Sequence, residues 1–253
     1  MLDQQELVSV LRQHGFDIAS LTRFALFEAG VSYRLTVKGV EAITNWQTLR
    51  GLVEVTGYWP VIVSNYENLE DIAGRGGKAR SPQDIIKEGL RLDVEQVLRQ
   101  YVEQYTSEYN KSLSEVVLRG AWPEPGEIPP TTSMITGEQF ESVNIVLLPT
   151  VEGWHVPAYL NFGNWNWCPA PHEHVCIMKH WHELYGADLM GMIDTTIEVW
   201  VRRPPRDRKS ALQLAWEQYV YCHETIGYDL VTNTIEDLAA RLLDSPLWYF
   251  WWD

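Results

Sequence analysis

The amino-acid sequence predicts an α+β (mixed α/β) fold in which a sheet is flanked by helices in each half and the two halves pack together. Val31–Val37 alternates apolar and polar residues, which is typical of a half-buried strand. Tyr58–Ser64 is a short apolar run, which favours a fully buried strand. Val94–Tyr105 instead carries an apolar stripe with helical spacing. Strands and helices are therefore both expected.

Helix start and stop signals place the elements of the N-terminal half. Gly57 ends a helix, because glycine readily adopts the left-handed conformation of a C-cap. Ser81 and Pro82 suit the N-cap and the first position of another helix. The expected elements are a helix over Leu2–His14, two strands within Ser20–Lys38, a helix over Glu41–Val55, a strand over Tyr58–Ser64, a helix from Ser81, and a helix from Val94 to about Leu118.

The C-terminal half is expected to contain more strands. Thr234 and Asp237 have the spacing of a capping box, which predicts a helix start there. The elements expected before and after it are strands at Val143–Leu148 and His155–Asn161, a helix near Pro171–Tyr185, strands at Asp188–Ile193 and Thr196–Val201, a helix after Pro205 to about His223, and a final strand within Ser245–Asp253.

A proline-rich segment suggests where the chain divides. Gly120–Pro130 holds four of the 13 prolines and two glycines. We therefore expect an N-terminal α/β region over residues 1–119, a proline-rich connection over 120–141 and a C-terminal domain over 142–253. The connection is either a linker or an ordered segment of one continuous core, and Trp122 and Ile128 could pack in the second case.

Composition limits the classes of function. The net charge of −14 repels phosphates, so neither nucleic acid nor an anionic membrane surface is an expected partner. Three cysteines in one half do not resemble a disulfide framework, and the N-terminus lacks the pattern of a signal peptide, so we expect a cytoplasmic location. Eight of the 12 tryptophans lie beyond residue 160, which predicts an aromatic core or an aromatic-lined pocket there.

The candidate catalytic and metal-binding residues are His172, Cys176 and His180. On a helix they lie at i, i+4 and i+8 and share one face, whereas the neighbours in His172-x-His174 and His180-x-His182 diverge by about 200°. Imidazole and thiolate bind zinc, and the same groups serve in acid–base or nucleophilic catalysis. The other interpretation is that these residues belong to a polar outer helix face that holds no site. We expect this second case, in which no cofactor is bound; a zinc ion at the three residues is the alternative.

Other side chains are candidates for ligand binding. Trp165, Trp167 and Trp248 could line an aromatic pocket, although core packing would also bury them. Arg203 lies in a run of five basic residues between 202 and 209, which could hold an anion or form a solvated turn. Gly74–Lys78 is rich in glycine but lacks the Ser or Thr of a phosphate loop, so a surface loop is expected.

The C-terminal half also resembles a bacterial family known as domain of unknown function 4253, from about Val175 to Asp253, with a weaker upstream match at Thr56–Pro60. The residues that carry the resemblance are Trp181-x-x-x-Tyr-Gly-Ala187, Arg203-Pro-Pro205, Ala211-x-x-x-Ala-x-Glu-Gln-Tyr219, Tyr221-Cys222 and Trp248–Asp253. The family resemblance implies a bacterial cytosolic protein. It implies no activity.

These observations lead to three hypotheses about function. The first is a non-enzymatic interaction protein, such as an inhibitor or immunity-type factor, that binds a protein with a basic face; it follows from the acidity and the lack of a complete catalytic motif. The second is a hydrolase- or transferase-type enzyme that uses the His172/Cys176/His180 face, with or without zinc. The third is a small-molecule sensor with an aromatic pocket near Trp165, Trp167 and Trp248.

Overall fold

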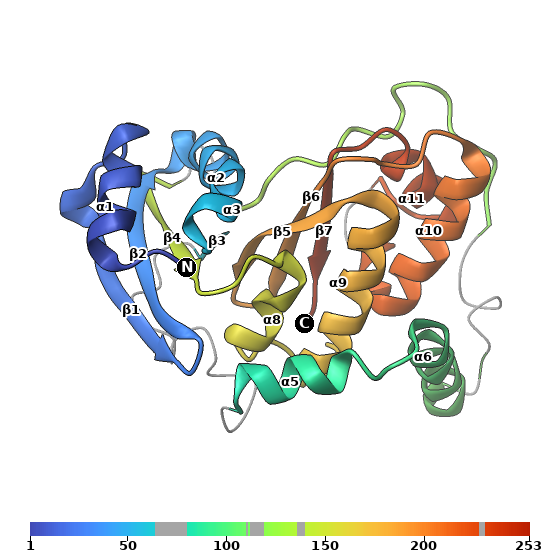
Figure 1. Ribbon diagram of the computed structural model, residues 1–253. Coiled ribbons are helices and arrows are strands. Elements are labelled where there is room, and N and C mark those ends of the chain that lie inside the picture. The colour runs from blue at the N-terminus through green and yellow to red at the C-terminus, as the bar shows by residue number, and fades with distance from the viewer. Residues whose placement is uncertain (64–79, 110, 112–118, 136–139, 228–230) are drawn as a thin grey trace.

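One mixed sheet runs through both halves of the chain (Figure 1). The computed structural model describes residues 1–63, 80–109, 111, 119–135, 140–227 and 231–253. Within them, seven strands are arranged in the order β1-β2-β4-β3-β5-β6-β7. β3 and β5 are parallel and the other neighbours are antiparallel. The strands are β1 (Thr22–Phe27), β2 (Gly30–Lys38), β3 (Trp59–Ile62), β4 (Ser142–Leu148), β5 (Ala187–Ile193), β6 (Thr196–Val201) and β7 (Leu247–Trp251).

Helices flank this sheet, so the predicted α+β class is confirmed. The α-helices are α1 (Gln4–Gln13), α2 (Ala42–Gly51), α3 (Val53–Thr56), α5 (Pro82–Gly89), α6 (Val94–Tyr109), α8 (Val156–Tyr159), α9 (Pro171–Tyr185), α10 (Arg208–Tyr221) and α11 (Ile235–Leu242). The 3-10 turns are η1 (Ile18–Ser20), η2 (Gly39–Glu41), η3 (Gly153–His155) and η4 (His223–Thr225). The expected loop at 65–80, with its Gly74–Lys78 segment, and the expected extension of α6 to Leu118 lie outside the described residues, apart from Arg80 and Lys111.

Local sequence signals predicted several element boundaries correctly, and one predicted strand is a helix. Gly57 ends α3 with a φ of 77°, and Thr234 and Asp237 form the predicted capping box of α11. The strand expected at His155–Asn161 is wrong, because the chain there forms η3 and α8. Pro157 accounts for the difference, since proline fits the first turn of a helix and cannot donate a hydrogen bond to a sheet.

The position of β4 joins the halves. β4 follows the proline-rich connection in sequence, yet it pairs with β2 on one side and with β3 on the other. β3 then meets β5 through Ile62 and Gly191. The sheets expected for the two halves are therefore parts of one sheet, and β4 is buried over Val143–Leu148.

Aromatic side chains pack against both faces of the C-terminal strands. Phe250 of β7 stacks on Trp181 of α9, with ring centroids 5.5 Å apart. Trp200 of β6 points to the opposite face, where its ring lies 6.5 Å from that of Trp46 of α2. The dense aromatic core that the tryptophan count predicted is thus present, and α9 and α2 contribute to opposite layers.

A buried carboxylate links elements from both halves. Asp188 of β5 is 1% exposed and accepts a hydrogen bond from Arg50 Nε of α2 at 2.9 Å. Its other oxygen lies 3.0 Å from His182 Nδ1 of α9, and Arg202 Nε after β6 lies 3.5 Å from the oxygen that Arg50 contacts. Because these partners come from separate elements, Asp188 fixes their relative positions.

We expect the substitution Asp188→Asn to lower the free energy of unfolding by about 3 kcal/mol, because it removes the negative charge that Arg50 and Arg202 share. Urea denaturation at pH 7 measures this loss. Asp244→Asn is the matched control: Asp244 is exposed at a φ of 54°, which asparagine adopts readily, so the change there should stay within about 0.5 kcal/mol. Equal effects of the two substitutions would contradict the assigned role.

Candidate functional site

A segment that we call the strap, residues 129–135, crosses one face of the sheet. Gly191, Glu198 and Tyr249 are register partners on β5, β6 and β7 and form a row across that face. Ile135 packs onto Gly191, where a Cβ atom would collide with its side chain. Ser133 Oγ and Met134 N–H donate hydrogen bonds to Glu198 at 2.7 Å and 2.5 Å. The strap therefore follows the row toward the edge strand β7.

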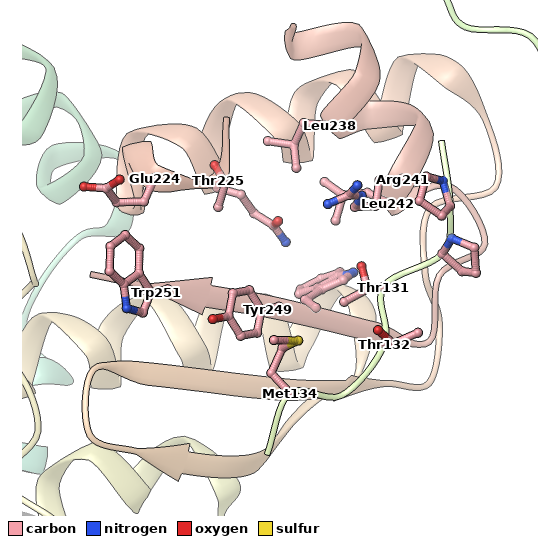
Figure 2. A pocket seen from close by; sticks show the side chains of 14 residues that line it. Thr131, Thr132, Met134, Glu224, Thr225, Leu238, Arg241, Leu242, Tyr249 and Trp251 are labelled. Atoms are coloured by element: carbon pink, nitrogen blue, oxygen red, sulfur yellow. The ribbon is translucent and has the colours of Figure 1, made fainter. Parts of the chain in front are cut away.

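A pocket of about 380 Å³ lies where the strap passes β7 (Figure 2). Its walls come from the strap, from α10 and α11, from η4 and from β7. Figure 2 shows Leu238, Arg241 and Leu242 on the α11 side, with Tyr249 and Trp251 across from them on the strand. Among the residues that the structure describes, the lining consists of Pro129, Pro130, Thr131, Thr132, Met134, Gln218, Glu224, Thr225, Leu238, Arg241, Leu242, Trp248, Tyr249 and Trp251.

Polar groups interrupt this largely apolar lining. Gln218 and Trp248 are each 1% exposed, and neither Gln218 Nε2 nor Trp248 Nε1 has a hydrogen-bond partner among the described residues. Arg241 contributes a guanidinium that points into the space between α11 and β7 (Figure 2). A buried donor without an acceptor costs about 1–3 kcal/mol. The pocket thus combines largely apolar walls with a few polar residues, which is the usual composition of a small-molecule site.

Glu198, which accepts the hydrogen bonds of the strap, has a carboxyl group with an unusually high pKa. It is fully buried, and this burial raises the pKa of its carboxyl to about 7 against the lowering effect of the hydrogen bonds from the strap. Near neutral pH the group is therefore shared between its neutral and charged forms. The neutral form can donate to Ser133 Oγ while it accepts from Met134 N–H, so both forms can retain the strap.

The predicted His/Cys face contacts three different elements. His172 Nε2 lies 3.9 Å from Glu88 of α5, and His180 Nε2 lies 3.5 Å from Glu217 of α10. Cys176 Sγ donates to Leu92 O at 3.7 Å, and burial raises the pKa of this thiol to about 11. Cys176 and His180 do line a shared groove beside the start of α6, but His172 does not belong to its lining.

His174, between these residues, forms a buried chain of hydrogen bonds that the sequence did not reveal. Its Nδ1 lies 2.7 Å from Tyr221 Oη, and its Nε2 lies 3.5 Å from Cys168 Sγ. Complete burial lowers the pKa of His174 to about 3, and burial raises the pKa of the Cys168 thiol. The neutral imidazole of His174 therefore links elements of the core through hydrogen bonds. The Cys168 thiol beside it stays protonated and does not supply the thiolate that a cysteine nucleophile requires.

No cluster of three or more His, Cys, Asp or Glu side chains among the described residues is placed to hold a metal ion. Within the same residues, none of the helices has both the length and the apolarity needed to cross a bilayer. These two findings concern only that part of the chain.

The candidate ligand-binding residues are dispersed, and one of them lines the pocket. Trp248 belongs to the lining. Trp165 packs on Phe162 with ring centroids 4.9 Å apart, and Trp167 packs between Tyr105 and His223 at 5.9 Å and 5.6 Å. Arg203 Nη2 donates to Glu183 O at the end of α9. The cation thus satisfies a terminal helix carbonyl in the favourable direction of the helix dipole.

The comparison with protein families bears on the part of the chain that builds most of the pocket. Residues 144–253 match the family described as domain of unknown function (DUF4253). The predicted resemblance is confirmed, and the match begins within β4 and extends to the end of the chain. The DUF4253 segment supplies α10, η4, α11 and β7 to the pocket, whereas the strap precedes it. No curated protein and no solved structure matched the chain in the other two comparisons.

We expect Glu198→Gln to remove a pH dependence of stability. Since the folded pKa of about 7 lies above the ordinary 4.5, the contribution of Glu198 to the stability of the wild type is fully present below pH 4.5, and up to roughly 3 kcal/mol of it is lost as the pH rises through 7. Gln mimics the neutral carboxyl and cannot ionise. Urea denaturation of both proteins at pH 5 and pH 8.5 tests this expectation, and other titrating groups cancel in the difference. Parallel losses in the two proteins would contradict it.

Proposed function

We propose that this protein binds an organic small molecule in the pocket between the strap, α11 and β7 and acts as a sensor or binding module. The observation that carries the proposal is a cavity of about 380 Å³ with largely apolar walls, where Leu238 and Leu242 of α11 lie across from Tyr249 and Trp251 of β7 (Figure 2). This volume equals that of about a dozen water molecules in the liquid and falls in the usual range of ligand sites.

The pocket supports this function better than the other two hypotheses. An enzyme that uses His172, Cys176 and His180 would need these side chains to converge, whereas they contact α5, the loop after α5 and α10. The binding of a protein with a basic face rests on the net charge of −14 and on the lack of a complete catalytic motif in the sequence. We place the proposed function in the bacterial cytosol, which the family resemblance and the three free cysteines support.

We expect ligand-observed NMR to find compounds that bind in a set of bicyclic aromatic ring systems. The set contains the carboxylate, the carboxamide and the methylamine derivative of each ring system. Leu238→Trp places an indole in the pocket from α11 and should weaken every binder at least about tenfold. Leu184→Trp is the matched control, because Leu184 is 50% exposed on α9 and does not line the pocket; its binding should equal that of the wild type.

A second variant blocks the pocket from its exposed side and serves as the test if Leu238→Trp does not fold. Met134→Trp extends into the pocket from the strap, where Met134 is 49% exposed, so it should block binding with little cost to the core. The proposed function fails if no compound of the set binds the wild type. It also fails if binding survives both Leu238→Trp and Met134→Trp in folded protein, or if a crystal soaked with a binder shows ordered water alone in the pocket.

A further inference from the structure

A groove outside the pocket lies where α5 packs beside η3 and α8 (Figure 1). Its volume is about 490 Å³, and none of its lining residues lines the pocket of Figure 2. Ile86 and Leu90 line it from α5 and the C-cap of that helix, and His155 and Tyr159 line it from η3 and α8. Leu90 is 50% exposed, so the groove offers an apolar surface that is open to solvent.

The charged side chains of this lining are both cations. Lys87 and Arg91 are exposed and four residues apart, so they are separated by about one helical turn. Neither side chain has a hydrogen bond or an ion pair with any residue that the structure describes. The nearby Glu88 lies outside the lining: its hydrogen bond with Arg80 at 2.6 Å is the main cause of its lowered pKa, and Arg91 acts on it only from a distance.

The other polar groups of the lining are neutral and already engaged. The amide oxygen of Gln83 accepts a hydrogen bond from Ser81 Oγ, and the hydroxyl of Tyr159 donates to Pro149 O. Burial lowers the pKa of His155 to about 4, so its imidazole carries no charge at neutral pH. The groove therefore combines an apolar surface with two unpaired positive charges.

We propose that this groove binds an acidic amphipathic helix of a partner protein. Apolar side chains of the partner pack on Ile86 and Leu90, and two carboxylates one helical turn apart reach Lys87 and Arg91. Helices bind in grooves through anchors that repeat at this spacing. The inference goes beyond the ligand pocket and concerns a different surface of the molecule.

Local charge favours an acidic helix in spite of the net charge of the chain. The value of −14 belongs to the whole protein, and salt screens exposed charges beyond about 8 Å at physiological ionic strength. At close range, the unpaired cations therefore determine which side chains the groove accepts, while the apolar contacts supply most of the affinity. An anionic bilayer is a poorer occupant, because a flat surface does not fill a groove and meets the charge of the whole protein.

Matched synthetic peptides test this assignment by calorimetry. The probe is an end-blocked helical peptide of about 18 residues, with leucines along one face and, beside them, two glutamates one turn apart. Its counterparts carry glutamines or lysines in place of the two glutamates. We expect the glutamate peptide to bind at least about tenfold more tightly than the lysine peptide, with the glutamine peptide between them.

Substitutions in the groove locate the contact. The double substitution Lys87→Glu and Arg91→Glu should reverse the order of the glutamate and lysine peptides. Its control is the double substitution Arg206→Glu and Lys209→Glu, which changes the net charge equally at two exposed cations outside the lining and should keep the order. Circular dichroism confirms that each variant is folded.

A second pair of substitutions tests the apolar contact. Leu90→Ser should weaken all three peptides at least about fivefold, because it removes apolar surface from the groove. Leu184→Ser is the matched control, since Leu184 is also 50% exposed but lies on α9 outside this lining. Binding to this control should equal binding to the wild type.

The outcomes decide between the occupants. If the glutamate and lysine peptides bind the wild type equally, or if Lys87→Glu with Arg91→Glu keeps their order, the acidic partner is wrong. If no peptide binds, or if Leu90→Ser binds all of them as the wild type does, the groove is not a docking site for a helix. Binding to phosphatidylserine vesicles, or self-association of the protein, without peptide binding would instead identify a membrane or a second copy as the occupant and overturn the proposal.

This inference and the proposed function fail separately. Leu238→Trp, which fills the ligand pocket, should bind the glutamate peptide as tightly as the wild type does, because Leu238 does not line the groove. Loss of peptide binding in this folded variant would contradict the assignment of the peptide to the groove.

Discussion

The insertion of β4 between β2 and β3 is the constraint that determines the course of the chain. β4 follows the strap in sequence, but its neighbours in the sheet come from the first 62 residues. The chain must therefore return from the β7 edge toward the middle of the sheet. The strap makes this return along the row of Tyr249, Glu198 and Gly191, and the pocket forms where it starts across β7.

The attachment of the strap depends on Gly191 and Glu198, two residues of that row that are unusual inside buried strands. Gly191 leaves room for Ile135 directly over β5, where any larger residue would displace it. Glu198 offers two acceptor oxygens inside an apolar layer, and its burial is tolerable because Ser133 and Met134 supply donors. A carboxyl with a pKa near 7 loses less free energy on burial than a fully charged one would.

The structure divides its buried polar groups into two kinds. Asp188 and His174 have close partners from several elements, so they bind parts of the core together. Gln218 and Trp248, whose Nε2 and Nε1 atoms lack such partners among the described residues, line a cavity. The aromatic core beside it also holds buried donors without partners among these residues, at Trp165 Nε1 and Trp252 Nε1, so the cavity itself distinguishes the pocket from that core.

The sequence alone determined most of the local structure, although it predicted a strand where η3 and α8 form. Periodicity located β2, β3, α6 and α9, glycine and capping signals placed the ends of α3 and α11, and the motifs around Trp181 and Trp248 identified the DUF4253 segment. It also showed that His180 and His182 face different ways, because helical geometry requires this. Only the tertiary structure decided that β4 joins the two halves and that Trp248, unlike Trp165 and Trp167, reaches a sizeable cavity. The order of strands in the sheet and the set of side chains that meet at one pocket both depend on contacts between residues far apart in sequence, such as Ser133 and Glu198. Local periodicity carries no information about such contacts.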